Sequence, residues 1–421
     1  MVQLWISMLL PPLIHTSLVK AQSYSTSPFN GNALAYFQSL ANGQTILAPI
    51  VSIHPNLTRV LPFGFSSNTN LTFVNGTTTP DDTHNSLFSK AKSAALISYS
   101  DEFLALVGPN PQATLVERRD SLFAFEAGAW IPEKRQVWFT SAVQSPPVSI
   151  FSLDLDTNAV TQVNSTGDPI ISASGGYFFE GAVYFGTSGD FIGNAGQSGG
   201  VVKVDVNTLR AETVVSSYFG LRVNVDDVAW VTQGETGKKY MFFSSIEYVK
   251  HGCAMASSVS QYDPQENFFR PVISATDIGL PNGVRASLDG KSLYVTDFAG
   301  TKEAALLNRA ADGVSAVYKY DLDADMLPVN RRLFSYTRQG IADGIHVDAS
   351  GRVWTAEGEG IVVRSPAGKV LGMFNVQFFT PEHAADLPIS NFALAGDELV
   401  VLGGNYLWRV KLAQAVVSVM N

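Results

Sequence analysis

A strand-like segment with an aromatic or apolar centre recurs six times along the chain. Each copy is a short apolar run that is bounded by Gly, Asp, Asn or Pro turns. The central residues are Trp138, Tyr184, Phe242, Tyr294, Trp354 and Val400, and the steps between them are 46, 58, 52, 60 and 46 residues. Repeats of this length, built from short strands, are typical of a β-propeller. The pattern from Leu122 to Leu412 therefore predicts an all-β propeller.

The N-terminal part of the chain has a different pattern. Residues 22–93 are rich in Ser, Thr, Asn and Pro and show little regular period, which predicts an extension that lies on the propeller. The apolar runs Ala95–Tyr99 and Phe103–Val107 read as strands. One of these strands could complete the last blade, because ring closure by an N-terminal strand protects the open edges. The expected division is residues 1–21, residues 22–93, and a propeller over residues 94–421.

The first residues, MVQLWISMLLPPLIHTSLVKAQS, contain a short apolar run that ends in Val19-Lys20-Ala21. Such a run predicts a signal peptide that is cleaved after Ala21, although Lys and Arg are absent before the run. A membrane anchor is the alternative. Pro11 and Pro12 argue against the anchor, because they interrupt a run that is already too short to span a bilayer. The chain is therefore expected to be secreted.

Four Asn-x-Ser/Thr sequons support the prediction of secretion. They begin at Asn56, Asn70, Asn75 and Asn164, and the first three lie within 20 residues of one another. This grouping predicts a glycosylated surface segment. Cys253 is the single cysteine, so no disulfide can form within the chain, and stability must come from the size of the core.

Composition narrows the classes of partner. Charged residues are 15% of the chain and the formal net charge is −9. No basic patch is visible in the sequence. Nucleic acid and anionic membranes are therefore poor partners for this chain.

Three of the six copies carry an oxygen-bearing side chain 11 or 12 residues before the centre, namely Glu126, Asn282 and Asp343. Equivalent positions in different blades fall on one ring around the propeller axis, so these side chains are expected to converge. Two carboxylates and a carboxamide form a hard-oxygen site that suits Ca²⁺, Mg²⁺ or Mn²⁺ better than Zn²⁺ or copper. An open position on such an ion would admit a water or a substrate carbonyl. The alternative is that each residue caps a strand or turn.

Two long motifs around these residues resemble the SMP-30/gluconolactonase family. The stretch LPNGVRASLDGKSLYVTD over 280–297 is similar to the family's L-P-N-G…S-P-D-G-K-x-L-Y-V-T-D, and IADGIHVDASGRVW over 341–354 is similar to its P-D-G-h-x-h-D-x-x-G-x-h-W/Y. The stretch FEAGAWIP over 125–132 resembles the family's E-G-P-x-W. The resemblance covers roughly residues 120–412, and it also extends to fungal secreted lactonohydrolases.

The resemblance implies a six-bladed propeller with one divalent metal ion, with Ca²⁺ expected first and Mg²⁺, Mn²⁺ or Zn²⁺ as alternatives. Glu126, Asn282 and Asp343 match the family's metal ligands, and Asp343 also matches its proposed general base. One departure lies in the third blade, where the family has an Asn-Asp pair. Asp226 stands at the expected Asn, and Asn224 matches a nearby family Asn if one residue is deleted. Asp226 would add negative charge beside the metal, or act as a second base.

Three further residues are candidates for contact with substrate or with the core. Arg285 could bind a substrate hydroxyl or pair with an acid. His251 lies in a loop after a third-blade strand, where it could cover the site or be solvated. His346 lies three residues after Asp343 and is expected to be a core histidine. Asn224 is another candidate for substrate binding, through its match to the family.

The leading hypothesis is a secreted, metal-dependent lactonase that acts on a small hydroxylated lactone of the aldonolactone or pantolactone type. A second hypothesis is a propeller altered at Asp226 that binds a small ligand or a protein without hydrolysis. A third is a different reaction on the same frame, as in strictosidine synthase-like propellers. The complete set of Glu126, Asn282 and Asp343 argues against the third, because a site without metal has little use for it.

Overall fold

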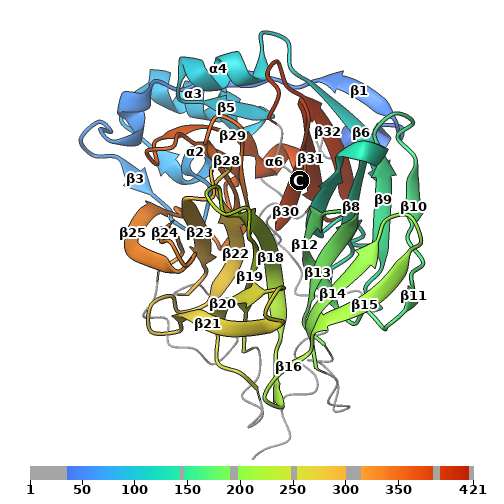
Figure 1. Cartoon of the computed structure of the whole chain (residues 1–421). Coiled ribbons are helices and arrows are strands. Elements are labelled where there is room, and N and C mark those ends of the chain that lie inside the picture. The colour runs from blue at the N-terminus through green and yellow to red at the C-terminus, as the bar shows by residue number, and fades with distance from the viewer. Residues whose placement is uncertain are drawn as a thin grey trace, which may run out of the picture.

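The computed structural model describes residues 36–142, 147–189, 198–247, 254–299, 314–382 and 389–416. Six mainly antiparallel sheets form the blades of a propeller (Figure 1), which confirms the fold class predicted from the repeat. In each blade the first strand lies innermost and contacts the first strands of the two neighbouring blades. These six inner strands are β7 (Glu126–Ile131), β12 (Ala173–Phe179), β18 (Val225–Thr232), β22 (Pro281–Ala286), β26 (Ala342–Val347) and β30 (Asn391–Ala395).

In blades 1 to 4 the remaining strands follow in chain order from the axis outwards, except that β11 lies at the outer edge of blade 2. Blade 1 continues with β8 (Gln136–Thr140), β9 (Ile150–Asp154) and β10 (Val160–Gln162), and blade 2 with β13 (Ala182–Thr187), β14 (Gly200–Asp205), β15 (Arg210–Val215) and the short β11 (Thr166–Gly167). Blade 3 continues with β19 (Lys239–Ser245), β20 (Ser258–Asp263) and β21 (Phe268–Ser274), and blade 4 with β23 (Ser292–Asp297), β24 (Ala316–Leu322) and β25 (Pro328–Tyr336). A separate hairpin of β16 (Ser217–Tyr218) and β17 (Leu221–Arg222) precedes blade 3.

Blades 5 and 6 take strands from both ends of the chain. Blade 5 consists of β26, β27 (Val353–Glu357), β28 (Gly360–Arg364), β29 (Val370–Asn375), β5 (Leu96–Ser98) and β2 (Ile50–Ser52). Blade 6 consists of β30, β31 (Glu398–Gly403), β32 (Tyr406–Lys411), β6 (Gln112–Arg118) and β1 (Gln44–Leu47). The antiparallel pairing of β6 with β32 closes the ring. The extension therefore contributes strands to two blades.

One strand expected in this region is a helix. Phe103–Val107 lies in α4 (Asp101–Val107), so the strand prediction for these residues was wrong. The Oγ of Ser100 accepts a hydrogen bond from the Phe103 N–H, and Asp101 and Glu102 occupy the first turn. A capping serine followed by acidic residues is a helix start signal, and it outweighs the short apolar run.

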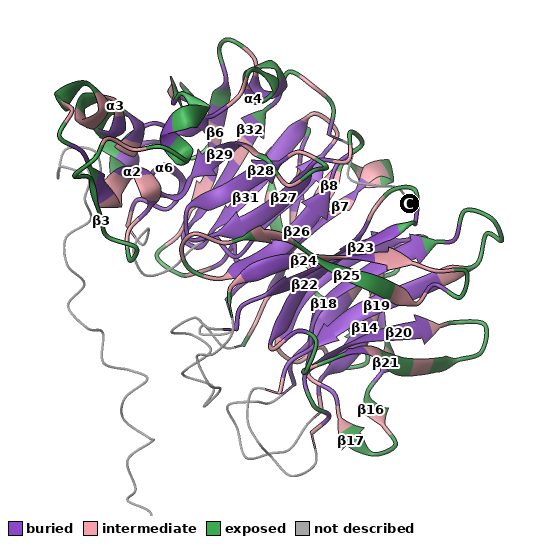
Figure 2. Ribbon diagram, turned by 90° about the vertical axis from the view of Figure 1, so that its left-hand side faces the viewer, coloured by how far each residue is buried: buried purple, intermediate pink, exposed green. Residues whose placement is uncertain are grey.

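The rest of the extension lies against blade 5 (Figure 2). It contains β3 (Ser66–Ser67), α2 (Phe73–Gly76), β4 (Thr77–Thr78) and α3 (Asp82–Lys92). Glu359, in the turn between β27 and β28, accepts hydrogen bonds from the Phe73 N–H at 2.8 Å and from Arg338 at 2.7 Å. Burial raises the pKa of Glu359 to about 6, even though Arg338 lowers it. The propeller pair Glu359–Arg338 therefore holds the extension by two hydrogen bonds, because Glu359 accepts the Phe73 N–H and Arg338 donates to the Leu71 carbonyl at 2.7 Å.

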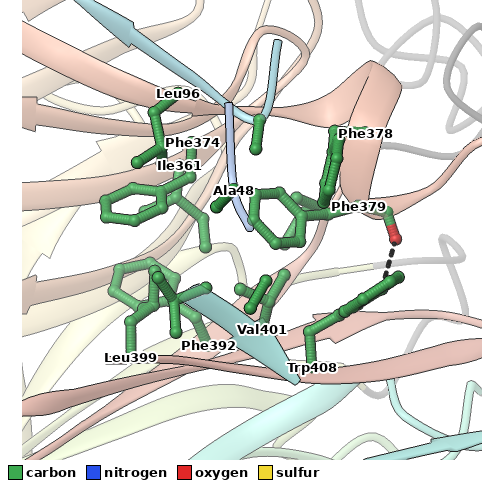
Figure 3. Packing of buried hydrophobic residues seen from close by; sticks show 14 of the residues in the cluster. Ala48, Leu96, Ile361, Phe374, Phe378, Phe379, Phe392, Leu399, Val401 and Trp408 are labelled. Atoms are coloured by element: carbon green, nitrogen blue, oxygen red, sulfur yellow. Dashed lines mark hydrogen bonds between the residues drawn. The ribbon is translucent and has the colours of Figure 1, made fainter. Parts of the chain in front are cut away.

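The largest apolar cluster joins blades 5 and 6 to the extension (Figure 3). Phe374, Phe378, Phe379 and Trp408 are buried in it together with Ala48 from the N-terminal part. The Trp408 indole N–H donates to the Phe379 carbonyl at 3.2 Å, which satisfies the one polar group of that side chain. Burial at this seam stabilises the closed ring, because full burial of each such side chain contributes about 1.5–3 kcal/mol.

No helix in the described ranges is both long and apolar enough to cross a membrane. The short helix α6 (Val376–Phe379) lies between β29 and β30 in the chain, and all four of its residues are buried.

Candidate metal and active site

Five inner strands begin with the same irregularity. In β7, β12, β18, β22 and β26, two residues near the start lie opposite a single residue of the second strand, as between Ala342 and Ile345. A β-bulge of this kind bends the strand and re-aims a side chain. Asp226, Asn282 and Asp343 are each the first residue inside the bulge, whereas Glu126 is the residue that opens it. The bulges explain how residues at one level of the repeat face the axis.

The structure brings the predicted ligands into one cluster. Asn282 donates a hydrogen bond to Asp343, and the carboxylates of Glu126 and Asp226 lie close enough to Asp343 to perturb it electrostatically. Asn282, Asp343 and Asp226 are 8%, 5% and 7% exposed, and Glu126 is half-buried. The side chains that sequence spacing and the resemblance selected are therefore neighbours.

The carboxylates of the cluster repel one another, and this repulsion raises the pKa values of Glu126 and Asp343. Burial raises the pKa of Glu126, and repulsion from Asp343 and Asp226 raises it further. Burial likewise raises the pKa of Asp343, followed by repulsion from Asp226 and Asp227. Enclosed carboxylates that repel one another favour a bound cation or a proton. The electrostatics therefore fit a site built for a cation.

The hydrogen-bond donors of this site are not among the residues predicted from the sequence. Ser174 Oγ in β12 donates to Asp226 Oδ1 at 2.8 Å, and Asn391 Nδ2 in β30 donates to Glu126 Oε2 at 3.1 Å. Ser390, which precedes Asn391, donates to Asp343. The repeat did contain a signal for two of these donors. In blade 3, Asp226 lies three residues before the inner-strand residue that pairs with the central residue of the second strand. Ser174 and Ser390 occupy the equivalent position in blades 2 and 6.

Asp227 and Arg285 form a second polar layer next to the cluster. Asp227 accepts the backbone N–H groups of Val228 and Val284 at 2.9 Å each, and Arg285 lies 3.9 Å from its Oδ2. Burial raises the pKa of Asp227 to about 6 although Arg285 lowers it. The Arg285 guanidinium also lies 4.8 Å from the centre of the Tyr177 ring. Of the two roles considered for Arg285, the structure shows the pairing with an acid.

The other candidates occupy distinct places. Asn224 lies just before β18, two residues from Asp226, and its carbonyl accepts the Ile246 N–H at 3.0 Å. His346 is buried against Phe392, with ring centres 4.8 Å apart, and burial followed by Arg285 lowers its pKa well below the usual range. His251 lies outside the described residues.

The donor set fits a hard divalent cation, because it consists of carboxylate and carboxamide oxygens. Glu126, Asp226, Asn282 and Asp343 would hold such an ion. Within the described part of the chain, no group of three or more His, Cys, Asp or Glu side chains is placed so that it could hold a metal ion as it stands. A carboxamide and small side-chain adjustments would therefore have to complete the coordination.

The predicted sequons differ in their exposure. Asn56, Asn70 and Asn164 are exposed. Asn75 is half-buried in α2, and both atoms of its amide group are buried without a hydrogen-bond partner. The nitrogen that would carry a glycan at Asn75 therefore faces the protein interior in the folded chain.

Comparison with known proteins defines the family. The model of the SMP-30/Gluconolactonase/LRE-like region matches residues 126–385, so this chain belongs to that family. The lactonohydrolase oryL of Aspergillus oryzae is 25% identical over 338 residues, which cover 73% of this chain and 72% of the relative. Among solved structures, a Xanthomonas campestris gluconolactonase aligns with a TM-score of 0.57 and 18% identity over 75% of this chain and 94% of its own.

A second solved structure is the calcium-binding protein regucalcin from Agrobacterium tumefaciens. It aligns with a TM-score of 0.50 and 16% identity, over 73% of this chain and 96% of its own. At these identities the two structures support the propeller fold alone.

Proposed function

We propose that this chain is a metal-dependent lactone hydrolase that acts on a small hydroxylated lactone of the aldonolactone or pantolactone type. The observation that carries the proposal is the convergence of Glu126, Asp226, Asn282 and Asp343 into one buried, oxygen-rich cluster. The family and the name of the Aspergillus relative, a lactonohydrolase, support the same reaction class.

The cluster would hold a divalent cation, Ca²⁺ in the first place and Mg²⁺, Mn²⁺ or Zn²⁺ as alternatives. Ca²⁺ comes first because its usual ligands are carboxylate and carboxamide oxygens. When bound, such an ion supplies Lewis-acid polarisation of the lactone carbonyl. Asp343 is the general base, because it is a buried carboxylate oriented by hydrogen bonds from Asn282 and Ser390.

In this reaction Asp343 accepts a proton from the attacking water, whose oxygen bonds to the carbonyl carbon. The ring C–O bond then breaks, and the released alkoxide takes up a proton to give the open hydroxy acid. Asp226 places a further carboxylate beside the reacting atoms, where it acts either as a metal ligand or as a second base. Asn224, which lies two residues from Asp226, and His251 are the proposed contacts for substrate hydroxyl groups.

The proposed setting is extracellular, with a signal peptide that is cleaved after Ala21 and glycans at the exposed sequons. The proposed partner is a small-molecule lactone, without nucleic acid or membrane, in keeping with the net charge of −9. An alternative function is ligand binding without hydrolysis. The observation that favours it is Asp226, which stands where the resemblance places an Asn.

A lactone panel assayed with and without chelator tests the proposal. Turnover of at least one hydroxylated lactone, lost with chelator and restored by Ca²⁺, is the expected result. Asp321→Asn is a matched control, because Asp321 pairs with Arg332 on the surface of blade 4 and should leave turnover unchanged. Metal binding without turnover of any lactone would favour the binding function, and no metal binding would refute the metal site.

A further inference from the structure

We propose that blades 2 and 6, which supply none of the proposed metal ligands, provide neutral donors that position the three carboxylates, and that Asn391 is the positioning residue for Glu126. The inference rests on the proposed metal site. It assigns a role to three residues of the described chain, Ser174, Ser390 and Asn391.

The orientation of the Asn391 amide is fixed from both sides. Its Oδ1 accepts the Phe392 N–H at 2.9 Å, so its NH₂ group must point the other way, where Nδ2 donates to Glu126 Oε2 at 3.1 Å. Asn391 is 2% exposed. A Cβ placed on Gly344 would lie 2.5 Å from Asn391 Oδ1, so the amide packs directly on the backbone beside Asp343. The donor is therefore immobile and aimed at one carboxylate oxygen.

The same arrangement recurs at the other two carboxylates. Ser390 donates to Asp343, while its own carbonyl accepts the Gly344 N–H at 2.9 Å and so fixes blade 6 against blade 5. Ser174 donates to Asp226 at 2.8 Å. Each carboxylate of the cluster thus has one neutral donor from a blade that contributes no ligand.

Neutral donors suit this position for a physical reason. A Lys or Arg would hold a carboxylate firmly, but its charge would compete with a bound cation. A hydroxyl or amide fixes the rotamer and leaves the full negative charge available. Among the three carboxylates, Glu126 depends most on such a donor to fix its rotamer. Its side chain has one more rotatable bond than that of an Asp, and the neighbouring carboxylates repel it. Asn391 removes this freedom before the cation arrives.

Calcium titration of chelator-treated protein by calorimetry tests the inference without measuring turnover. Asn391→Ala is expected to weaken Ca²⁺ binding about 10–100-fold, the range found for residues that orient metal ligands. Asn405→Ala is the matched control. Asn405 is a buried blade 6 amide whose Nδ2 donates to the Arg119 carbonyl, away from the carboxylates. Its loss should lower stability to a similar extent and leave the Kd unchanged.

Ser390→Ala gives a second reading if Asn391→Ala folds poorly, and it should also weaken Ca²⁺ binding. If the wild-type chain binds Ca²⁺ but Asn391→Ala and Ser390→Ala bind it within threefold of wild type, the inference is overturned and the proposed function stands. An equal effect of Asn405→Ala would also overturn it, because the effect would then be structural. If the wild-type chain binds neither Ca²⁺ nor Mg²⁺, Mn²⁺ or Zn²⁺, both proposals fall.

Discussion

The guanidinium of Arg285 lies 3.9 Å from Asp227 Oδ2, and the two side chains are only 7% and 4% exposed. Asp227 belongs to β18 and Arg285 to β22, so the pair joins the inner strands of blades 3 and 4. The pair also places the positively charged guanidinium of Arg285 three residues after Asn282 on the same strand. Two neighbouring blades are thereby fixed directly behind the proposed metal site.

Arg285→Met should be strongly destabilising, because it leaves Asp227 buried without its cation. Removal of one partner of a buried ion pair costs about 3–5 kcal/mol, and the two backbone donors to Asp227 place the expected loss near 3 kcal/mol. Urea unfolding at pH 7 measures it. The surface variant Arg332→Met, which breaks the exposed pair with Asp321, should change stability by less than about 1 kcal/mol. Equal losses in the two variants would contradict this account.

Asp343→Asn should keep the fold and most of the metal affinity but lose most turnover. The carboxamide can still offer an oxygen to a cation, but it cannot accept the proton of the attacking water. Loss of a general base lowers the rate about 10²–10⁴-fold. Steady-state kinetics on the best lactone of the panel, together with calcium titration, measures both quantities. Turnover close to wild type would move the role of base to another residue, with Asp226 as the first to test.

Asp226→Asn separates the possible roles of Asp226. If Asp226 only tunes the metal, removal of one negative charge should weaken Ca²⁺ binding, and turnover should persist or rise at saturating Ca²⁺. If Asp226 is itself a base, turnover should fall about 10²–10⁴-fold even at saturating metal. Kinetics at a series of Ca²⁺ concentrations distinguishes the two outcomes. If neither form opens any lactone, the protein is a binder.

Glu359 should make stability depend on pH. Its pKa in the folded chain is about 6, above the ordinary value of 4.5 for Glu. Between these values the native state keeps a proton that the unfolded state has lost, so stability falls as pH rises from about 4.5 to 6 and is level above. The free energy of unfolding of wild type should therefore drop by about 2 kcal/mol relative to Glu359→Gln across this window. Parallel pH curves for the two proteins would show that Glu359 does not titrate in this way.

Much of the fold could be predicted because it depends on repeated local signals. The six strand centres, from Trp138 to Val400, each lie in the second strand of a blade, and their spacing was sufficient to recognise the propeller. The places of Glu126, Asn282 and Asp343 followed from the same repeat. Other parts of the fold could not be predicted in this way. In the pairs β5–β29 and β6–β32, the contacting residues lie hundreds of positions apart in the sequence, and a local pattern does not reveal such contacts.

The donors of the site escaped prediction for a different reason. Ser174, Ser390 and Asn391 are ordinary residues of β-strand borders, and their sequence surroundings do not match the Pro-Asn-Gly and Asp-Gly motifs of blades 4 and 5. Their role appears only when the bulges and the ring place them beside the carboxylates. Arg285 shows the same limit, because its partner Asp227 belongs to another blade.

The pairing of Arg118 with Tyr406 spans almost 290 residues of sequence, and it has a consequence for synthesis. During translation β6 emerges long before β32, so the edge that pairs with β32 stays without that partner until residues 406–411 have been made. Exposed strand edges of this kind recruit other chains. A ribosome that stalls before Tyr406 would thus release a product with an open ring and a free edge. Closure of the ring therefore waits for β32, and the unpaired edge of β6 marks chains in which that strand is missing.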